Sequence, residues 1–413
     1  MNMRIASLCI RALTLAVRFS LIFVLALYFE PSQVGLYGLV VATVGYSLYF
    51  VGFDFYVFST RDLLGRSREQ WPRLLTSQGA LFLGLYCLVL PWSFFLFYSN
   101  LLPWWMMAWV IGLIIVEHLG QEIMRLAIAM GRPVLGTFLL FVRQGVWALA
   151  FMFAIWLEPG FRTLHDLLLF WIIGSACSVL LGSTILLQFR WRGLVNGVDW
   201  HWIRTGLRVA FPMLVATLAL RAIFTLDRYW FGFVNSSELL GVYTLFIGIA
   251  GAVLAFMDAG VFAFLYPKMI ECFKKGDSAG FKALKASLAR QTLGWLAVLM
   301  VAGGVMGPAV FSLMPNPLYF EHWPLFWGCL LAMGVFVASM VPHYSLYSMS
   351  LDKPIILSNM LGLLVFVAGG ALCSVFTTYW AVPVAMCAAA LAMGISKQLV
   401  LVFRGSEYFS QSV

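Results

Sequence analysis

Residues 208–243 read RVAFPMLVATLALRAIFTLDRYWFGFVNSSELLGVY, and this stretch decides the fold class of the chain. It is apolar over more than the roughly 20 residues that a helix needs to cross a bilayer, yet it retains Arg221, Asp227 and Arg228. Charged side chains are costly in hydrocarbon, so charges that are kept within a span are candidates for function. The polar turn Asn235-Ser236-Ser237 then separates this span from the next.

The composition of the whole chain agrees with a membrane protein. Hydrophobic residues make up 62% of the 413 residues and charged residues 10%, against a charged share of about 25% in soluble domains. A soluble fold could not bury so much apolar surface. The seven cysteines are scattered singly without a C-x-x-C pair, so we expect neither a disulfide framework nor a metal site. No cofactor is indicated.

Apolar runs of membrane length predict an all-α polytopic protein of about twelve spans. The first run is interrupted by Arg11 and Arg18, and we interpret it as a retained helix rather than a signal peptide. A basic segment after residue 59 is expected at the interface, residues 190–204 are expected to form a central loop, and the Lys-rich segment 268–290 is compatible with a helix. The expected spans are 7–29, 34–58, 77–98, 104–124, 133–157, 165–188, 208–233, 238–265, 291–314, 323–348, 353–376 and 380–402.

The distribution of basic residues predicts the orientation of these spans. With the N-terminus inside, 19 of the 26 Lys and Arg residues fall on cytoplasmic segments, six fall within spans and Arg162 alone falls on an outer loop. Membrane proteins concentrate Lys and Arg on the cytoplasmic side, so both termini are expected there. The same distribution explains the net charge of +9 without nucleic acid as a partner.

Several classes of chemistry lack their sequence signatures. The chain has no G-x-x-x-x-G-K-[ST] phosphate loop, no H-E-x-x-H and no G-x-S-x-G. The predicted loops are short, whereas a membrane enzyme such as a polymerase or ligase would need a sizeable loop for its catalytic groups. These observations favour transport over catalysis.

The two halves of the chain open in similar ways. Gly35 and Gly241, and Tyr37 and Tyr243, are each 206 residues apart and open the second and eighth spans. The preceding spans each carry two arginines seven residues apart. We therefore predict two six-helix lobes, residues 1–195 and 196–413, related by a parallel internal repeat of the kind that alternating-access transporters use.

These motifs carry a resemblance to a known family. The turn Pro31-Ser32-Gln33-Val34-Gly35-Leu36-Tyr37, the Asp227-Arg228 pair and the Leu240-Gly241-Val242-Tyr243 start of the eighth span resemble the polysaccharide-exporter branch of the MATE/oligosaccharidyl-lipid flippase superfamily. The twelve spans are similar to Wzx-type flippases. The resemblance implies a bacterial inner-membrane transporter of an undecaprenyl-pyrophosphate-linked oligosaccharide, for O-antigen or capsule assembly with a polysaccharide polymerase as a partner. Drug-exporting relatives of the same fold remain an alternative, as does a polyprenyl-lipid enzyme.

Intramembrane arginines are the candidate ligands of such a cargo. Residues seven apart share a helix face, so Arg11 and Arg18 lie together, as do Arg221 and Arg228. A guanidinium presents a fork of donors that suits a pyrophosphate. We expect Arg11, Arg18, Arg143 and Arg221 to line a cavity, although ion pairs within the bundle would also accommodate them. Arg11, Arg228 and Lys397 lie near predicted helix ends, where their side chains can also extend to the interface.

Intramembrane acids are candidates for ion coupling. Glu117, Asp258 and Asp54 are the residues for which we expect this role, because a carboxyl group in an apolar cavity can exchange a proton. The alternative is that Glu117 and the nearby Glu122, which lies on the same span as His118 and Gln121, pair with Arg125 or Arg143 and hold helices together. Asp227 and Arg228 are expected near the outer rim or gate. His343 is expected to pack or to line the cavity.

Overall fold

The computed structural model describes residues 3–189, 191 and 197–410, and within these ranges all regular secondary structure is helical. Twelve of the described helical segments are long and apolar enough to cross a membrane, which confirms the predicted fold class. The α-helices are α1 (Met3–Tyr28), α2 (Pro31–Gly52), α3 (Tyr56–Leu64), α4 (Trp71–Tyr98), α5 (Met107–Ala129), α6 (Pro133–Phe141), α7 (Trp147–Leu157), α8 (Leu164–Ser183), α9 (Trp200–Val234), α10 (Ser237–Met257), α11 (Ala263–Lys274), α12 (Ser278–Phe311), α13 (Leu318–Glu321), α14 (Trp323–Ser348), α15 (Asp352–Phe376) and α16 (Thr378–Ser410). Short 3₁₀ or π segments are η1 (Trp104–Met106), η2 (Val142–Val146), η3 (Pro159–Phe161), η4 (Thr184–Gln188) and η6 (Asp258–Phe262).

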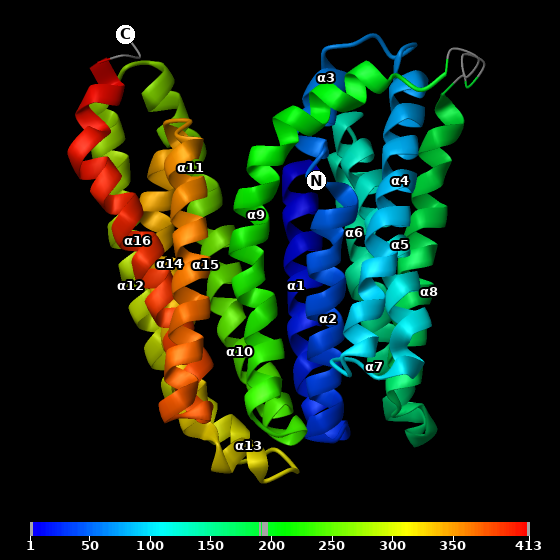
Figure 1. The fold of residues 1–413 in the computed structure, drawn as a ribbon, viewed down its shortest axis with the longest axis vertical. Coiled ribbons are helices and arrows are strands. Elements are labelled where there is room, and N and C mark those ends of the chain that lie inside the picture. The colour runs from blue at the N-terminus through cyan, green and yellow to red at the C-terminus, as the bar shows by residue number, and fades with distance from the viewer. Residues whose placement is uncertain (1–2, 190, 192–196, 411–413) are drawn as a thin grey trace. The chain divides into compact units, whose positions relative to one another are not determined.

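The chain forms two compact units (Figure 1). The first unit comprises Met1–Phe29 and Leu39–Val215, and the second comprises Glu30–Gly38 and Ala216–Val413. Helix α9 contributes its first part to the first unit and its remainder to the second. The start of α2 likewise packs with the second unit, although most of α2 belongs to the first.

The second predicted span, 34–58, has different ends in the structure. Helix α2 begins at Pro31 and ends at Gly52, because Phe53 and Asp54 have φ values of 53° and 47° and so interrupt the right-handed helix. Left-handed backbone is uncommon outside glycine, although aspartate tolerates it better than most residues. The chain turns at this point and continues as the separate short helix α3.

Helices α9 and α12 begin earlier than hydropathy alone predicts. The Asp199 Oδ1 atom accepts a hydrogen bond of 2.9 Å from the Trp202 backbone N–H, so α9 starts at Trp200 rather than near residue 208. The Asp277 side chain likewise accepts from the Gly280 N–H at 2.8 Å at the start of α12. Such N-caps satisfy N–H groups that lack partners within the helix. Arg190 and Arg192 of the predicted central loop lie outside the described residues.

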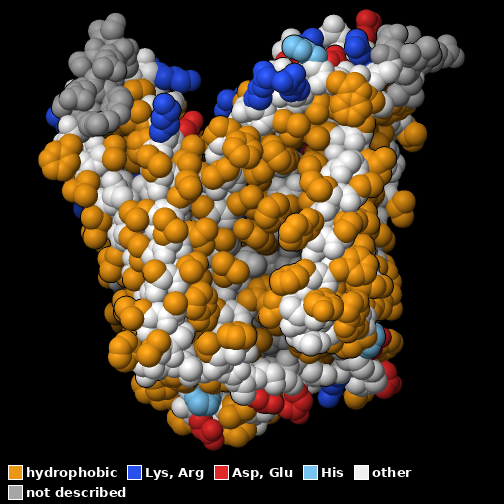
Figure 2. All heavy atoms as spheres, viewed as in Figure 1, with side chains coloured by type: hydrophobic (Ala, Val, Ile, Leu, Met, Phe, Trp, Pro, Cys, Tyr) orange, Lys and Arg blue, Asp and Glu red, His pale blue; other side chains and the backbone are white. Residues whose placement is uncertain are grey.

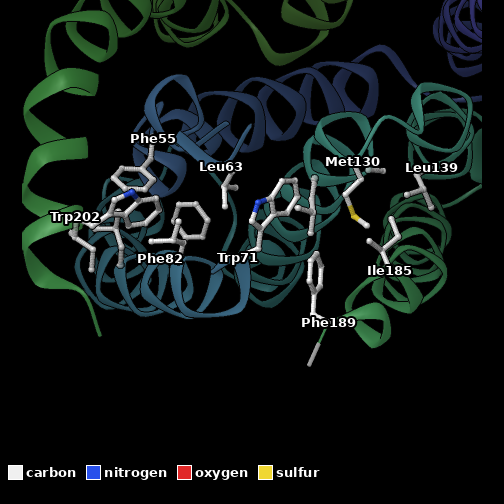
Figure 3. Close-up of a cluster of buried hydrophobic side chains, with 14 residues drawn as sticks. Phe55, Leu63, Trp71, Phe82, Met130, Leu139, Ile185, Phe189 and Trp202 are labelled. Atoms are coloured by element: carbon white, nitrogen blue, oxygen red, sulfur yellow. The ribbon is translucent and has the colours of Figure 1, made fainter. Parts of the chain in front are cut away.

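An aromatic cluster fixes the start of α9 within the first unit (Figure 3). The rings of Phe55 and Trp202 meet edge to face with centroids 5.2 Å apart, and Trp202 Nε1 donates to Asp62 Oδ2 at 2.9 Å. Gly206 allows this approach, since a Cβ atom there would lie 2.4 Å from the Phe55 ring. The same cluster continues through Leu63, Trp71, Leu74, Leu81, Phe82, Leu126, Ala127, Met130, Leu139, Ile185, Phe189 and Ile203.

The second unit has an aromatic core of its own. The ring centroids of Phe246 and Phe311 lie 4.6 Å apart, and those of Phe311 and Phe326 lie 5.1 Å apart. The start of α2 packs against α10 so closely that a Cβ atom on Gly241 would lie 1.7 Å from the Pro31 carbonyl oxygen. Gly241, which the internal comparison of the two halves singled out, is therefore required for this helix contact.

The surface of each unit has the pattern of a membrane protein. Hydrophobic side chains cover the flanks, whereas Lys and Arg gather at the end of the first unit that carries α3 and at the end of the second unit near the turn from α11 to α12 (Figures 1 and 2). Exposed apolar side chains include Trp92, Phe233 and Phe376, which are 74%, 82% and 81% exposed. Exposed apolar area on this scale is expected where the solvent is lipid.

Candidate functional site

Glu117 and Arg143 form a buried ion pair in the first unit. The Nη1 atom of Arg143 lies 3.2 Å from Glu117 Oε2 and also donates to the Glu117 carbonyl oxygen at 2.8 Å. The other carboxylate oxygen, Oε1, accepts from Trp171 Nε1 at 2.8 Å and from the Ser175 hydroxyl at 2.6 Å. Glu117 and Arg143 are 4% and 3% exposed. The pair therefore joins α5, α8 and the π segment η2.

Local backbone features place Arg143 in this position. It lies in η2, one π-helical turn between α6 and α7, and such turns are frequent at functional sites. A Cβ atom at Gly120 of α5 would lie 2.9 Å from Arg143 Cδ, so glycine leaves room for the arginine stem to pass. The pairing of Glu117 with Arg143 is one of the arrangements that the sequence analysis left open. Cargo binding by Arg143 and ion coupling at Glu117 stay predictions.

A second polar group lies on another face of α5. The ring nitrogen Nδ1 of His118 shares a 2.6 Å hydrogen bond with the Tyr86 hydroxyl. Glu122 accepts from Gln78 Nε2 at 2.8 Å and pairs with Arg125. Glu117, His118 and Glu122 lie on one helix, as expected from the sequence, but their partners differ: Glu117 bonds to α8, whereas His118 and Glu122 bond to α4.

Exposed arginines occupy the first helix. The side chains of Arg11 and Arg18 are both exposed on α1. Arg18 Nη1 donates to the amide oxygen of Gln144 at 3.2 Å, so the hydrogen bond described for this guanidinium goes to a neutral group. Among the salt bridges of the described side chains, none involves Arg11 or Arg18.

Asp54 lies in the turn that ends α2. Its side chain is only 5% exposed, and its backbone has the positive φ noted above. A role of Asp54 in coupling stays a prediction.

The second unit holds Asp227 and Arg228 in a network of hydrogen bonds. Asp227 is fully buried, and its Oδ2 atom accepts from the Tyr243 hydroxyl at 3.0 Å. Arg228 Nη1 lies 3.3 Å from Asp227 Oδ1 and donates to the Phe224 carbonyl at 2.8 Å. These contacts join α9 to α10. The rim or gate role expected for this pair stays a prediction.

Arg221 and Asp258 are close enough for their charges to interact. Both side chains are exposed, and the Tyr344 hydroxyl donates to Asp258 Oδ1 at 3.2 Å. Asp258 begins the π segment η6, which joins α10 to α11. A predicted cation and a predicted coupling acid are therefore neighbours in this unit.

Sequence reasoning missed several partners of these charges. Trp171 and Ser175, the donors to Glu117, are four residues apart on α8, a spacing that places polar groups on one helix face and could have marked them. The expectation that the Lys397 side chain extends to the interface is wrong, because this side chain is 0% exposed. The reason is that α16 continues to Ser410, so Lys397 lies within the helix and not near its end.

Comparisons with known proteins agree at the level of the fold. No protein-family model and no curated protein matches the sequence. The inward-facing structure of a multidrug resistance MATE family transporter of the MOP superfamily is similar with a TM-score of 0.78 and 11% identity, covering 96% of each chain. The crystal structure of a mutant of the Vibrio cholerae MATE transporter VcmN is similar with a TM-score of 0.55 and 13% identity, covering 98% of this chain and 95% of that one.

A third similar structure is a MOP superfamily transporter from Pyrococcus furiosus, for which reverse polarity of the binding pocket suggests a different function. Its TM-score is 0.51 at 12% identity, with 98% of this chain and 94% of that chain covered. The present chain therefore has the MATE transporter fold, and the MATE-like architecture expected from the sequence is confirmed.

Proposed function

We propose that this chain is a transporter that moves a polyprenyl-pyrophosphate-linked oligosaccharide from the cytoplasmic to the outer leaflet of the bacterial inner membrane by alternating access. The product would supply assembly of a surface polysaccharide, with a polymerase acting on it afterwards. The fold of known transporters supports the general class, and the charges within the spans support the anionic cargo.

The proposal rests mainly on the charges within the spans. Helix α1 exposes two arginines, whereas acidic side chains within the spans accept hydrogen bonds from residues of their own unit. The Glu117 carboxylate accepts from Trp171 and Ser175 and forms an ion pair with Arg143. Asp227 accepts from Tyr243 and Arg228. Arg18, in contrast, is exposed and bonds a neutral amide. A guanidinium in a low-dielectric environment favours an anion, and its paired N–H groups fit two phosphate oxygens.

The same fold also supports a second candidate, a cation-coupled multidrug exporter. The similar MATE structure is a multidrug resistance transporter, and the exposed carboxyl of Asp258 is the type of group that attracts a cationic drug. The similar P. furiosus protein, with its reverse pocket polarity, is a precedent for different pocket charges on this fold. The sign of the exposed charge therefore separates the two candidates, and on α1 that sign is positive.

Transport by purified protein in liposomes tests the proposal. A fluorescently labelled polyprenyl-pyrophosphate oligosaccharide and ethidium would be offered in parallel assays. We expect the wild-type protein to move the labelled lipid. In Arg18→Ala the transport rate should fall roughly 10- to 100-fold, since a hydrogen bond to a charged group contributes about 1.5–3 kcal/mol. Arg18→Lys should recover only part of the rate, because an ammonium lacks the fork.

The matched control is Arg132→Ala, which removes an exposed arginine between α5 and α6. It should move the labelled lipid at the wild-type rate. Wild-type protein that moves ethidium and leaves the pyrophosphate lipid in place would overturn the proposal in favour of the drug exporter.

A further inference from the structure

Lys397 is a fully buried cation in the second unit, and no acidic side chain accompanies it among the described residues. Its relative exposure is 0%, and no salt bridge among the described residues involves it. An isolated ammonium is very unfavourable in a low-dielectric interior unless an opposite charge or hydrogen-bond acceptors surround it. The structure therefore raises the question of what balances this charge.

Asn359 is the one hydrogen-bond partner that the structure describes for Lys397. The amide oxygen of Asn359 accepts from Lys397 Nζ at 3.1 Å, and the amide nitrogen donates to the Ala216 carbonyl at 3.2 Å. A carbonyl oxygen only accepts, so the bond to Ala216 fixes the amide orientation and leaves its oxygen facing the lysine. Because an ammonium has three donors, two N–H groups of Lys397 remain for another acceptor.

His343 supplies a second donor in the same region. Its Nδ1 atom is buried without a hydrogen-bond partner among the described residues. Helices α14 and α16 are in close contact one turn earlier, where a Cβ atom on Gly394 would lie 3.1 Å from Ser339 Cβ, and His343 follows Ser339 by four positions and Lys397 follows Gly394 by three. A neutral imidazole can carry its proton on Nδ1 and donate from there. Helices α14, α15 and α16 thus bring together an ammonium, an imidazole and a fixed amide. Donors exceed acceptors in this group.

We propose that Lys397 and His343 form a binding site for a small inorganic anion of the halide class in the core of the second unit. Lys397 supplies the charge and two N–H donors, and His343 Nδ1 supplies a third donor. The Lys397 side chain is 0% exposed, so the proposed occupant is a monatomic anion, chloride, which can be enclosed together with the lysine. Through Asn359, the bound anion stabilises the contact of α15 and α16 with α9 at Ala216.

Thermal unfolding of the purified full-length protein in sodium chloride and in sodium gluconate, at equal ionic strength, tests the site. Ligands that bind only the folded state raise its stability by mass action. We expect the midpoint to rise with chloride and to saturate, by about 3–5 °C at ten times the dissociation constant. Bromide should act in the same way, and its anomalous scattering in a crystal should give a peak beside Lys397.

Variants separate the site from general salt effects. Lys397→Met should lose the difference between chloride and gluconate, whereas Lys353→Gln, which removes an exposed lysine at the start of α15, should retain it. If Lys397→Met does not fold, Asn359→Asp provides the second measurement. An aspartate there places a permanent carboxylate beside the ammonium, so chloride should no longer raise the midpoint.

Equal midpoints of the wild-type protein in chloride and gluconate over the whole concentration range would overturn the proposal. A chloride effect that survives in Lys397→Met or in Asn359→Asp would overturn it as well, because the anion would then bind elsewhere. These measurements do not involve transport, so they are independent of the proposed cargo.

Discussion

Replacement of Arg143 by alanine distinguishes a structural ion pair from a cargo ligand. The substitution leaves the carboxylate of Glu117 buried, with Trp171 and Ser175 as its remaining side-chain donors. Breaking a buried pair from one side costs about 3–5 kcal/mol, because the other charge is then uncompensated. For a unit of about 200 residues this corresponds to a fall of roughly 10 °C in the unfolding midpoint.

A double-variant cycle isolates the contribution of the pair itself. Glu117→Gln alone leaves the Arg143 guanidinium without its counter-charge, and we expect a loss similar to that of Arg143→Ala. The double variant Glu117→Gln/Arg143→Met contains no buried charge at either position. The two side chains are in contact, so their effects on stability should not add. We expect the double variant to lose less free energy of unfolding than the two single variants Glu117→Gln and Arg143→Met lose together, by about 2 kcal/mol or more.

Two assays are compared for each purified variant. Thermal unfolding in one detergent is monitored by tryptophan fluorescence, and transport of the labelled pyrophosphate lipid is measured in liposomes. Arg132→Ala is the matched control and should unfold at the wild-type midpoint. If Arg143→Ala unfolds within about 2 °C of the wild type and no longer transports, the pair is not structural. Arg143 would then be a cargo ligand, as expected from the sequence.

Two further substitutions test local features of the second unit. Gly241→Ala should destabilise the protein by about 1–3 kcal/mol, because the new Cβ atom meets the Pro31 carbonyl at 1.7 Å, whereas Gly251→Ala on the same helix meets no atom within 4 Å and should be neutral or slightly stabilising; the unfolding midpoints check both. The hydrogen bond that Lys275 donates to Glu271 raises the pKa of Lys275. The contribution of this pair to the stability of the folded state is therefore present at neutral pH and is lost as pH rises through the raised pKa. This pair is exposed, and Lys275→Gln should therefore leave the midpoint unchanged within about 1 °C from pH 7 to pH 9.

The spans could be predicted from sequence because hydropathy is a local property. The ends of some spans could not be predicted, because contacts with distant segments decide where those helices begin and end. The backbone reversal at Phe53 and Asp54 lies inside an apolar run and has no proline to mark it. Trp202 was expected in the central loop, but it is buried against Phe55 as a core residue and lies within α9. Side-chain packing between distant segments decided the second case.

The sequence identified which charged residues belong to the candidate site, but it did not determine which of them pair with each other. Glu117 and Arg143 were recognised as intramembrane charges, and Arg143 was one of two arginines considered as the partner. A π-helical turn contains an extra residue that rotates the following helix, so the face on which a side chain lies near η2 or η6 cannot be counted from a regular helical period. Arg143 and Asp258 both lie in such turns. Arg11 and Arg18 lie in regular helix, where the helical period can be counted, and both are exposed. That they line a cavity stays a prediction.

The balance of charges within the spans links the two proposals. Arg143 is balanced by Glu117, Arg228 by Asp227, and Arg221 interacts with Asp258. Of the six cations that the sequence analysis placed within spans, three remain, and the described residues give none of them an acidic partner: Arg11, Arg18 and Lys397. Two of them are exposed and can meet a large anion, while the third is enclosed and can meet only a small one. A cationic cargo would add to this excess of positive charge, whereas an anionic cargo reduces it.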